Sequence, residues 1–83
     1  MMQMIFIDAR DYASPRQMHE SIAMMLDFPA HYGCNADALN DCLGELAAPV
    51  NVVVSDMGDG DIAAALETCL RVFRDQGGKV TVL

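Results

Sequence analysis

Three short apolar runs, separated by segments with helical periodicity, constrain most strongly how this chain folds. The runs lie at residues 4–7, 50–55 and 80–83 and are rich in β-branched or aromatic side chains, which is typical of β-strands. The second run is broken only by Asn51, which predicts a strand covered on both faces. Strands that alternate with helices pair in parallel through right-handed crossovers. The pattern therefore predicts a small α/β domain with a three-stranded parallel sheet.

The segments between these runs predict helices in the order β-α-α-β-α-β. The first helix begins at Ser14, an N-cap followed by proline, and ends before Pro29, because the residue ahead of a proline is pushed out of the helical conformation. Asn35 is a good N-cap for a second helix that reaches Glu45. A third follows the turn at 56–60 and ends in a left-handed cap at Gly77-Gly78. The residues expected to face the core are Met18, Ile22, Met25 and Leu26, then Leu39, Cys42, Leu43 and Leu46, and finally Ile62, Leu66, Cys69, Leu70 and Phe73.

Length and composition limit the class of protein. A chain of 83 residues is expected to form one domain spanning 1–83, since so short a chain encloses a single core. A formal charge of −7 argues against direct binding to nucleic acid or to a membrane surface, which needs clustered Lys and Arg. No apolar run approaches the roughly 20 residues of a membrane span, no signal peptide is visible, and three cysteines are an odd number, which fits a reducing compartment. We therefore expect a cytoplasmic monomer.

The charges are segregated along the chain. From Gln17 to Leu70 there is no Lys or Arg. A field of one sign attracts molecules of the other sign, so the expected partner is basic. The acidic residues of this stretch are Glu20, Asp27, Asp37, Asp41, Glu45, Asp56, Asp59, Asp61 and Glu67.

Within the second predicted helix, Asp37 and Asp41 lie one turn apart, about 6 Å along the axis. Asn40 lies on the same side, while Leu39 and Leu43 point the other way. Such a row of carboxylates resembles the spacing of phosphates along RNA. The alternative is an ordinary solvated helix face, although like charges at this spacing cost about 0.2–0.5 kcal/mol and have no basic neighbour to offset them.

The segment Phe28-Pro29-Ala30-His31-Tyr32-Gly33-Cys34-Asn35-Ala36-Asp37-Ala38-Leu39-Asn40-Asp41-Cys42-Leu43 resembles the signature of the barstar family, the intracellular protein inhibitors of secreted ribonucleases. The order of elements matches too, and residues 70–75 and 79–83 resemble the family's last helix and strand. The resemblance implies a barstar-like fold and inhibition by occlusion, in which the acidic helix and the preceding loop cover the active site of a basic ribonuclease.

Carried over by position in the motif, Asp37 and Asp41 would enter that active site, with Asp41 as the central anchor. Gly33 and Asn35 would shape the loop, and Asp75 would make a peripheral contact. The type inhibitor has aromatic rings where this chain has His31 and Asn40, which favours a different basic ribonuclease as the target. The predicted partner-binding residues are His31, Tyr32, Gly33, Asn35, Asp37, Asn40, Asp41 and Asp75.

Two alternatives to ribonuclease inhibition stay open. One is an acidic module that binds another basic protein, such as a non-nuclease toxin or regulator. The other is a small thiol- or metal-dependent enzyme using His31 and Cys34, against which stand the lack of four well-spaced metal ligands and the acidic surroundings of the thiol. We expect no catalytic residue, metal or cofactor. Cys42 and Cys69 are expected to pack in the core, Cys34 to be an exposed loop thiol, and His19 to face solvent.

Overall fold

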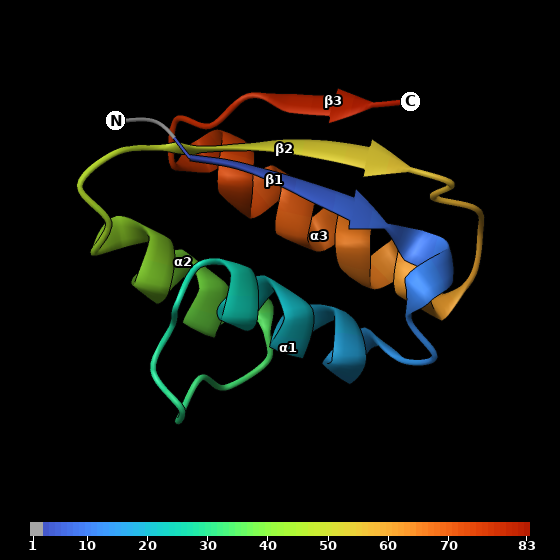
Figure 1. The fold of residues 1–83 in the computed structure, drawn as a ribbon, viewed down its shortest axis with the longest axis horizontal. Coiled ribbons are helices and arrows are strands. Elements are labelled where there is room, and N and C mark those ends of the chain that lie inside the picture. The colour runs from blue at the N-terminus through green and yellow to red at the C-terminus, as the bar shows by residue number, and fades with distance from the viewer. Residues whose placement is uncertain (1–2) are drawn as a thin grey trace.

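A computed structural model describes residues 3–83 and contains one three-stranded parallel sheet (Figure 1). Its strands are β1 (Gln3–Asp8), β2 (Val50–Ser55) and β3 (Val80–Val82), in the order β1-β2-β3. The register places Phe6 beside Val53, and Val53 beside Thr81. The predicted α/β fold with the element order β-α-α-β-α-β is confirmed. The predicted 1–83 domain includes residues 1 and 2, which lie outside the described part.

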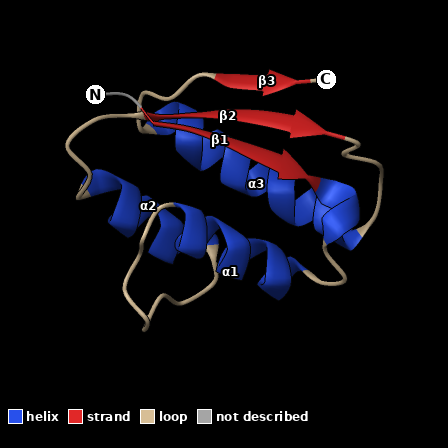
Figure 2. Cartoon of the chain, in the orientation of Figure 1, coloured by secondary structure: helices blue, strands red, loops and turns tan. Residues whose placement is uncertain are grey.

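Three α-helices cover one face of the sheet: α1 (Pro15–Met25), α2 (Ala36–Gly44) and α3 (Asp61–Asp75) (Figures 1 and 2). The strand order explains this placement. When successive right-handed crossovers advance the strands in one direction, every connecting helix falls on the same side. No helix within residues 3–83 is long and apolar enough to cross a membrane.

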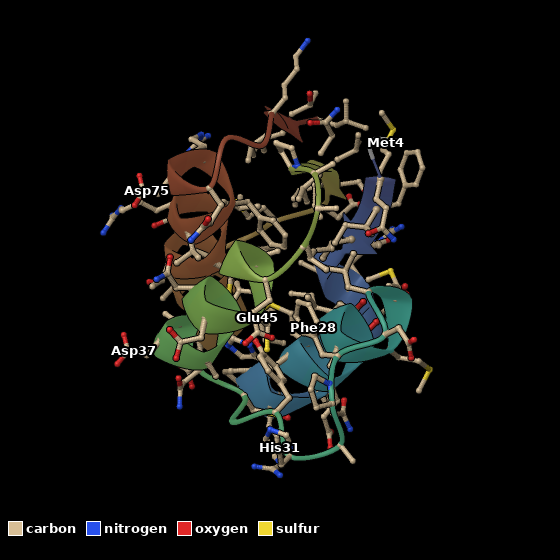
Figure 3. All side chains as sticks on the ribbon, turned by 90° about the vertical axis from the view of Figure 1, so that its left-hand side faces the viewer. Met4, Phe28, His31, Asp37, Glu45 and Asp75 are labelled. Atoms are coloured by element: carbon tan, nitrogen blue, oxygen red, sulfur yellow. The ribbon has the colours of Figure 1, made fainter. Side chains whose placement is uncertain are left out.

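The prediction that β2 is covered on both faces is therefore wrong. Along β2 the residues alternate between buried and partly buried, with Val52 and Val54 at 1% and 0% exposure. On β1 the same alternation leaves Met4 and Phe6 57% and 67% exposed on the open face, and Met4 projects there in Figure 3. An apolar run predicts that a strand forms, but it does not predict whether one or both faces of that strand are covered.

The core forms between the covered face of the sheet and the helices. Most residues predicted to face it are buried, including Met18 and Ile22 on α1, Leu39 on α2, and Leu66 and Phe73 on α3. The remaining buried side chains are Ile5, Ile7, Ala9, Leu26, Leu43, Val50, Val52, Val54, Ala63, Cys69 and Leu70, with His19 as the polar member.

Six side chains depart from their predicted burial, and two of them, Leu46 and Ile62, pack against the core but are only partly buried. Met25, the last residue of α1, is 37% exposed, whereas Leu26, which follows it, is buried. Asp27 has a left-handed φ of 57°, which ends the helical conformation before Phe28. Cys42 and Cys34 are each partly buried, rather than packed in the core and exposed, respectively. His19, expected in solvent, is buried because it points from α1 toward α3 and the loop that follows α1.

The helix ends predicted from sequence have the expected bonds. The Ser14 hydroxyl accepts a hydrogen bond from the Gln17 N–H at the start of α1. At the end of α3, Gly77 has a φ of 88°, the Gly77 N–H donates to the Arg74 carbonyl, and the Gly78 N–H donates to the Phe73 carbonyl at 2.9 Å. This pair of bonds is the Schellman arrangement. It turns the chain directly into β3.

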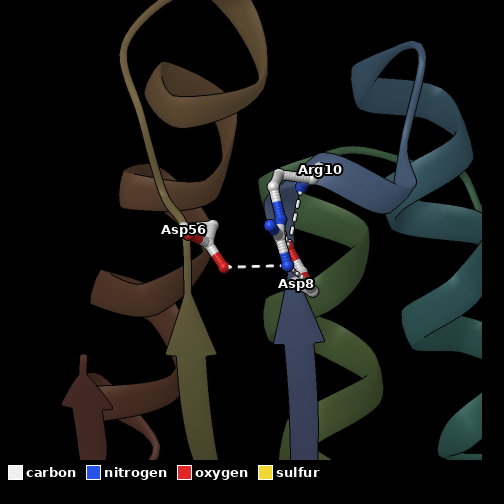
Figure 4. Close-up of polar contacts among 3 residues, drawn as sticks. All are labelled: Asp8, Arg10 and Asp56. Carbon is white, nitrogen blue, oxygen red and sulfur yellow. Dashed lines mark hydrogen bonds and ion pairs between the residues drawn. The ribbon is translucent and has the colours of Figure 1, made fainter.

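A short 3₁₀ helix (η1, Ala9–Asp11) follows β1. Arg10 in this turn donates to both Asp8 oxygens and lies 3.2 Å from the Asp56 carboxylate at the end of β2 (Figure 4). The hydrogen bonds from Arg10 lower the pKa of Asp8. The Arg10 side chain is 70% exposed, so these pairs contribute little to stability.

Candidate functional site

Helix α2 presents its acidic side chains to solvent because its apolar side is fixed in the core. Leu39 and Leu43 are 0% and 6% exposed. Asp37 and Asp41 lie on the opposite side and are exposed. Among residues 3–83, ion pairs join Arg10 to Asp8 and Asp56, and Arg16 to Glu20. In the described part of the chain the carboxylates of Asp37 and Asp41 therefore have no basic side chain bound to them.

The start of α2 is held by Asn35. Its backbone is extended, with φ −145° and ψ 171°, and its side-chain oxygen accepts from the Ala38 N–H at 2.8 Å. The Asn35 amide nitrogen also donates to the Gly33 carbonyl at 3.3 Å. One side chain thus joins the loop to the first turn of the helix.

Replacing Asn35 with Ala should lower the free energy of unfolding by about 1 kcal/mol, within the range of about 0.5–2 kcal/mol known for lost N-caps. Urea unfolding followed by circular dichroism measures this difference. Asn35→Ser is the matched control, because serine also caps helices and should retain most of the stability. Equal midpoints for Asn35→Ala and wild type would show that the cap does not stabilise α2.

The loop at residues 29–34 is anchored from inside by Tyr32. The Tyr32 ring packs against Phe28, with ring centres 5.2 Å apart, and its hydroxyl lies 2.9 Å from Nδ1 of His19. Burial is the main reason that the pKa of the Tyr32 phenol is raised, so it stays protonated. His31, by contrast, is exposed at the outer end of the loop (Figure 3). The loop therefore has a fixed inner side and a free outer side.

A pocket of about 270 Å³ lies between this loop and α2. The carboxylates of Asp41 and Glu45 border it from the helix, and His31 borders it from the loop. A cationic side chain placed here would meet two acids beside an apolar wall, where charge pairs are less screened than in open water. The lining residues are Pro29, His31, Tyr32, Gly33, Ala38, Asp41, Cys42 and Glu45.

A second contact connects α2 to the end of α3. The Gln76 amide donates to the Asn40 side-chain oxygen at 2.8 Å and to the Asn40 carbonyl at 3.3 Å. Asp75 precedes Gln76 and is exposed. Figure 3 shows Asp37 and Asp75 projecting from the same side of the molecule, one from α2 and the other from α3.

The structure thus distributes the predicted residues over three adjoining segments. His31, Tyr32, Gly33 and Asp41 line one pocket, Asp37 and Asn40 extend the surface along α2, and Asn35 supports it from the loop boundary. Asp75 is not a pocket residue. Glu45 lines the pocket but is absent from the predicted set, although the four-residue spacing of Asp37, Asp41 and Glu45 carried the signal.

Two of the thiols, Cys42 and Cys69, have little nucleophilic character. Burial raises the pKa of Cys69 to about 11. Burial and the nearby carboxylates of Glu45 and Asp41 raise the pKa of Cys42. Protonated thiols are poor nucleophiles and poor metal ligands. Within residues 3–83, no group of three or more His, Cys, Asp or Glu side chains could hold a metal ion.

Comparison with known proteins decides the family. The sequence model described as "Barstar (barnase inhibitor)" matches residues 2–81. The chain belongs to the barstar family. A protein of Bacillus subtilis (strain 168), named "Putative ribonuclease inhibitor YrdF", is 41% identical over 56 residues. That match covers 66% of the present chain and 62% of the Bacillus protein, so the chain spans less than two thirds of its relative. The family is named for inhibition and not for catalysis.

Proposed function

We propose that this barstar-family chain inhibits a basic ribonuclease by covering its active site with α2 and the loop at 29–34. The observation that carries the proposal is the pair of exposed carboxylates, Asp37 and Asp41, on a helix that is capped at Asn35 and anchored by Leu39. A ribonuclease holds basic side chains where it binds RNA phosphates. Carboxylates at a similar spacing compete for the same positions.

The pocket beside Asp41 supports the same proposal. Asp41, Glu45 and His31 surround a space large enough for one basic side chain of the ribonuclease. On the far side of α2, Asp75 adds a peripheral charge. We further propose that the chain acts as a monomer in the cytoplasm, where it would protect the cell's own RNA.

The proposed target differs from the ribonuclease for which the family is named. Asn40 uses its side chain to bind Gln76, and His31 offers a smaller ring than a phenol or indole would. Apolar contact area at these two positions is therefore reduced. A basic ribonuclease with polar groups facing Asn40 and His31 fits this surface better.

Co-purification with a panel of basic bacterial ribonucleases, barnase among them, tests the proposal. We expect at least one of them to be retained by the immobilised chain and to lose its RNA-cleaving activity in the complex. Retention of a basic protein without ribonuclease activity would instead favour the second role, that of a module for another basic partner. Retention of none, with RNA cleavage unchanged, would refute both.

Association with the ribonuclease should slow as salt is added. The acidic surface attracts a basic partner only within about one Debye length, because salt screens the attraction at longer distances. The Debye length falls from about 30 Å at 0.01 M to about 8 Å at 0.15 M ionic strength. Stopped-flow measurement of the association rate across this range should show a fall of about tenfold or more. The dissociation rate serves as the internal control and should change far less. An association rate independent of salt would contradict electrostatic steering.

A further inference from the structure

His19 is the one buried polar side chain among residues 3–83, and the proposed inhibition does not use it directly. It is 5% exposed and lies on α1 between Met18, which is fully buried, and Glu20, which is exposed. Buried polar groups need hydrogen-bond partners. Both partners of His19 come from other parts of the chain.

The first partner is Tyr32, the inner anchor of the loop at 29–34. Nδ1 of His19 lies 2.9 Å from the Tyr32 hydroxyl, and the two ring centres are 5.9 Å apart. The second partner is Cys69 on α3, whose sulfur lies 3.6 Å from Nε2. The imidazole therefore joins α1, α3 and the loop at one point.

A neutral imidazole suits this position and a charged one does not. The neutral ring has one donor and one acceptor, and the hydroxyl and thiol can each complement either of them. Protonation makes both nitrogens donors and places a charge in the core, where it is poorly solvated. Burial accordingly lowers the pKa of His19.

His19, Tyr32 and Cys69 form one buried cluster, and neither Tyr32 nor Cys69 titrates near neutral pH. Cys69 has a pKa of about 11, and the pKa of Tyr32 is raised mainly by burial, with Cys69, Cys34 and Cys42 adding to the shift. These thiols face the cluster from α3, the loop and α2.

The charged groups on α1 beside His19 are Arg16 and Glu20, and both are exposed. Nε of Arg16 lies 3.9 Å from Oε2 of Glu20. A charged His19 thus has no carboxylate of its own within the described cluster to stabilise it.

We infer that His19 is a positioning residue: its neutral ring holds Tyr32, and through Tyr32 the binding loop, and its protonation releases that loop. The inference rests on the proposed function for its biological meaning, since it makes inhibition weaker in acid. It needs no ribonuclease for its first test.

The first test follows the loop by NMR in the His31→Gln variant, which leaves His19 as the remaining histidine of the two. As the pH falls from about 8 to 5, the amide signals of Tyr32 and Gly33 should shift with the same midpoint as the His19 ring. In the double variant His31→Gln/His19→Asn this shift should vanish, because the amide of asparagine can still bind the Tyr32 hydroxyl without titrating. The inference would be overturned if the amide signals of the loop did not change as His19 titrates. It would also be overturned if the His19 ring stayed neutral until the protein unfolds.

The second test measures inhibition of the panel ribonuclease that the wild-type chain binds. His19→Leu removes both hydrogen bonds and should weaken inhibition at neutral pH by about tenfold, the loss expected for a buried hydrogen bond that orients a contact. His19→Asn should recover most of that loss and should flatten the pH dependence that His31→Gln retains. In a double-mutant cycle, Tyr32→Phe should add little to His19→Leu, because both remove the same contact.

The two proposals fail in different ways. A chain that inhibits no ribonuclease but shows the coupled NMR shifts would refute the proposed function alone. If the wild type, His19→Leu and His19→Asn inhibit the ribonuclease equally well and with the same pH profile, the positioning role alone is refuted. A purely structural role for His19 would lower the melting temperature without changing that pH profile.

Discussion

Replacing Asp41 with Ala should weaken the complex with the target ribonuclease more than any other single substitution. Asp41 is exposed in the free chain, lies at the middle of α2, and borders the pocket between α2 and the loop. In the complex we expect its carboxylate to be desolvated against a basic side chain of the nuclease. Removing one member of a buried charge pair costs about 3–5 kcal/mol, because the other charge stays buried without its partner. This corresponds to a loss of about 10²- to 10⁴-fold in affinity, which isothermal titration calorimetry can measure.

The control for Asp41→Ala must change the net charge by the same amount at another exposed position. Asp59→Ala does so in the turn before α3, outside the proposed surface. It should change the affinity by less than about 1 kcal/mol, as expected for a solvent-exposed charge. If Asp41→Ala binds as tightly as Asp59→Ala, Asp41 is not the anchor.

Replacing Gly78 with Ala should produce the largest loss of stability among the glycine substitutions. A Cβ at Gly78 would overlap the Val50 carbonyl oxygen and would lie 3.0 Å from the Phe73 carbonyl oxygen. Both obstacles are backbone atoms, one at the start of β2 and the other near the end of α3, so neither can rotate away. We expect a loss of about 3 kcal/mol, at the upper end of the usual cost of overpacking. The melting temperature should then fall by about 12–24 °C, because about 4–8 °C accompanies each kcal/mol in a domain of this size.

Gly44→Ala is the matched comparison for Gly78→Ala. Gly44 is the last residue of α2, and the nearest atom to an added Cβ is the Gln76 amide nitrogen at 3.8 Å, an ordinary contact. Alanine favours the helical conformation by about 0.5–1 kcal/mol over glycine, so this variant should equal or exceed the wild type in stability. Thermal unfolding of the two variants measures the difference. Similar melting temperatures for both would contradict the close approach at Gly78.

Local signals in the sequence were sufficient to predict the three strands and the three α-helices of this fold. Ser14 and Asn35 each cap a helix through a side-chain oxygen, and Gly77 supplies the left-handed residue that ends α3. Such caps depend on neighbours within four residues, so they can be recognised without tertiary structure. The parallel sheet followed from the alternation of strands and helices.

Features that depend on tertiary contacts could not be predicted in this way. His19 is buried because Tyr32 and Cys69, 13 and 50 residues away, converge on its ring. Phe6 is exposed because the strand order places every helix on the opposite face of the sheet. Neither the distant partners of His19 nor the strand order is encoded in the local pattern around these residues.

For the candidate site, sequence predicted the direction of the side chains better than their partners. The helical spacing placed Asp37 and Asp41 opposite Leu39, as the structure has them. Spacing within one helix could not show that Gln76 binds Asn40, since that contact spans 36 residues. That these residues bind a ribonuclease is a prediction.

Titration of an RNA-cleavage assay with the chain tests the central claim most directly. A basic ribonuclease from the panel, held at fixed concentration, should lose its activity in proportion to the added chain. Its RNA cleavage should be fully inhibited near one chain per enzyme. The Asp41→Ala variant should require a much higher concentration to give the same inhibition. If every ribonuclease of the panel continues to cleave RNA at full rate in a large excess of wild-type chain, the carboxylates of α2 do not act as a substitute for RNA.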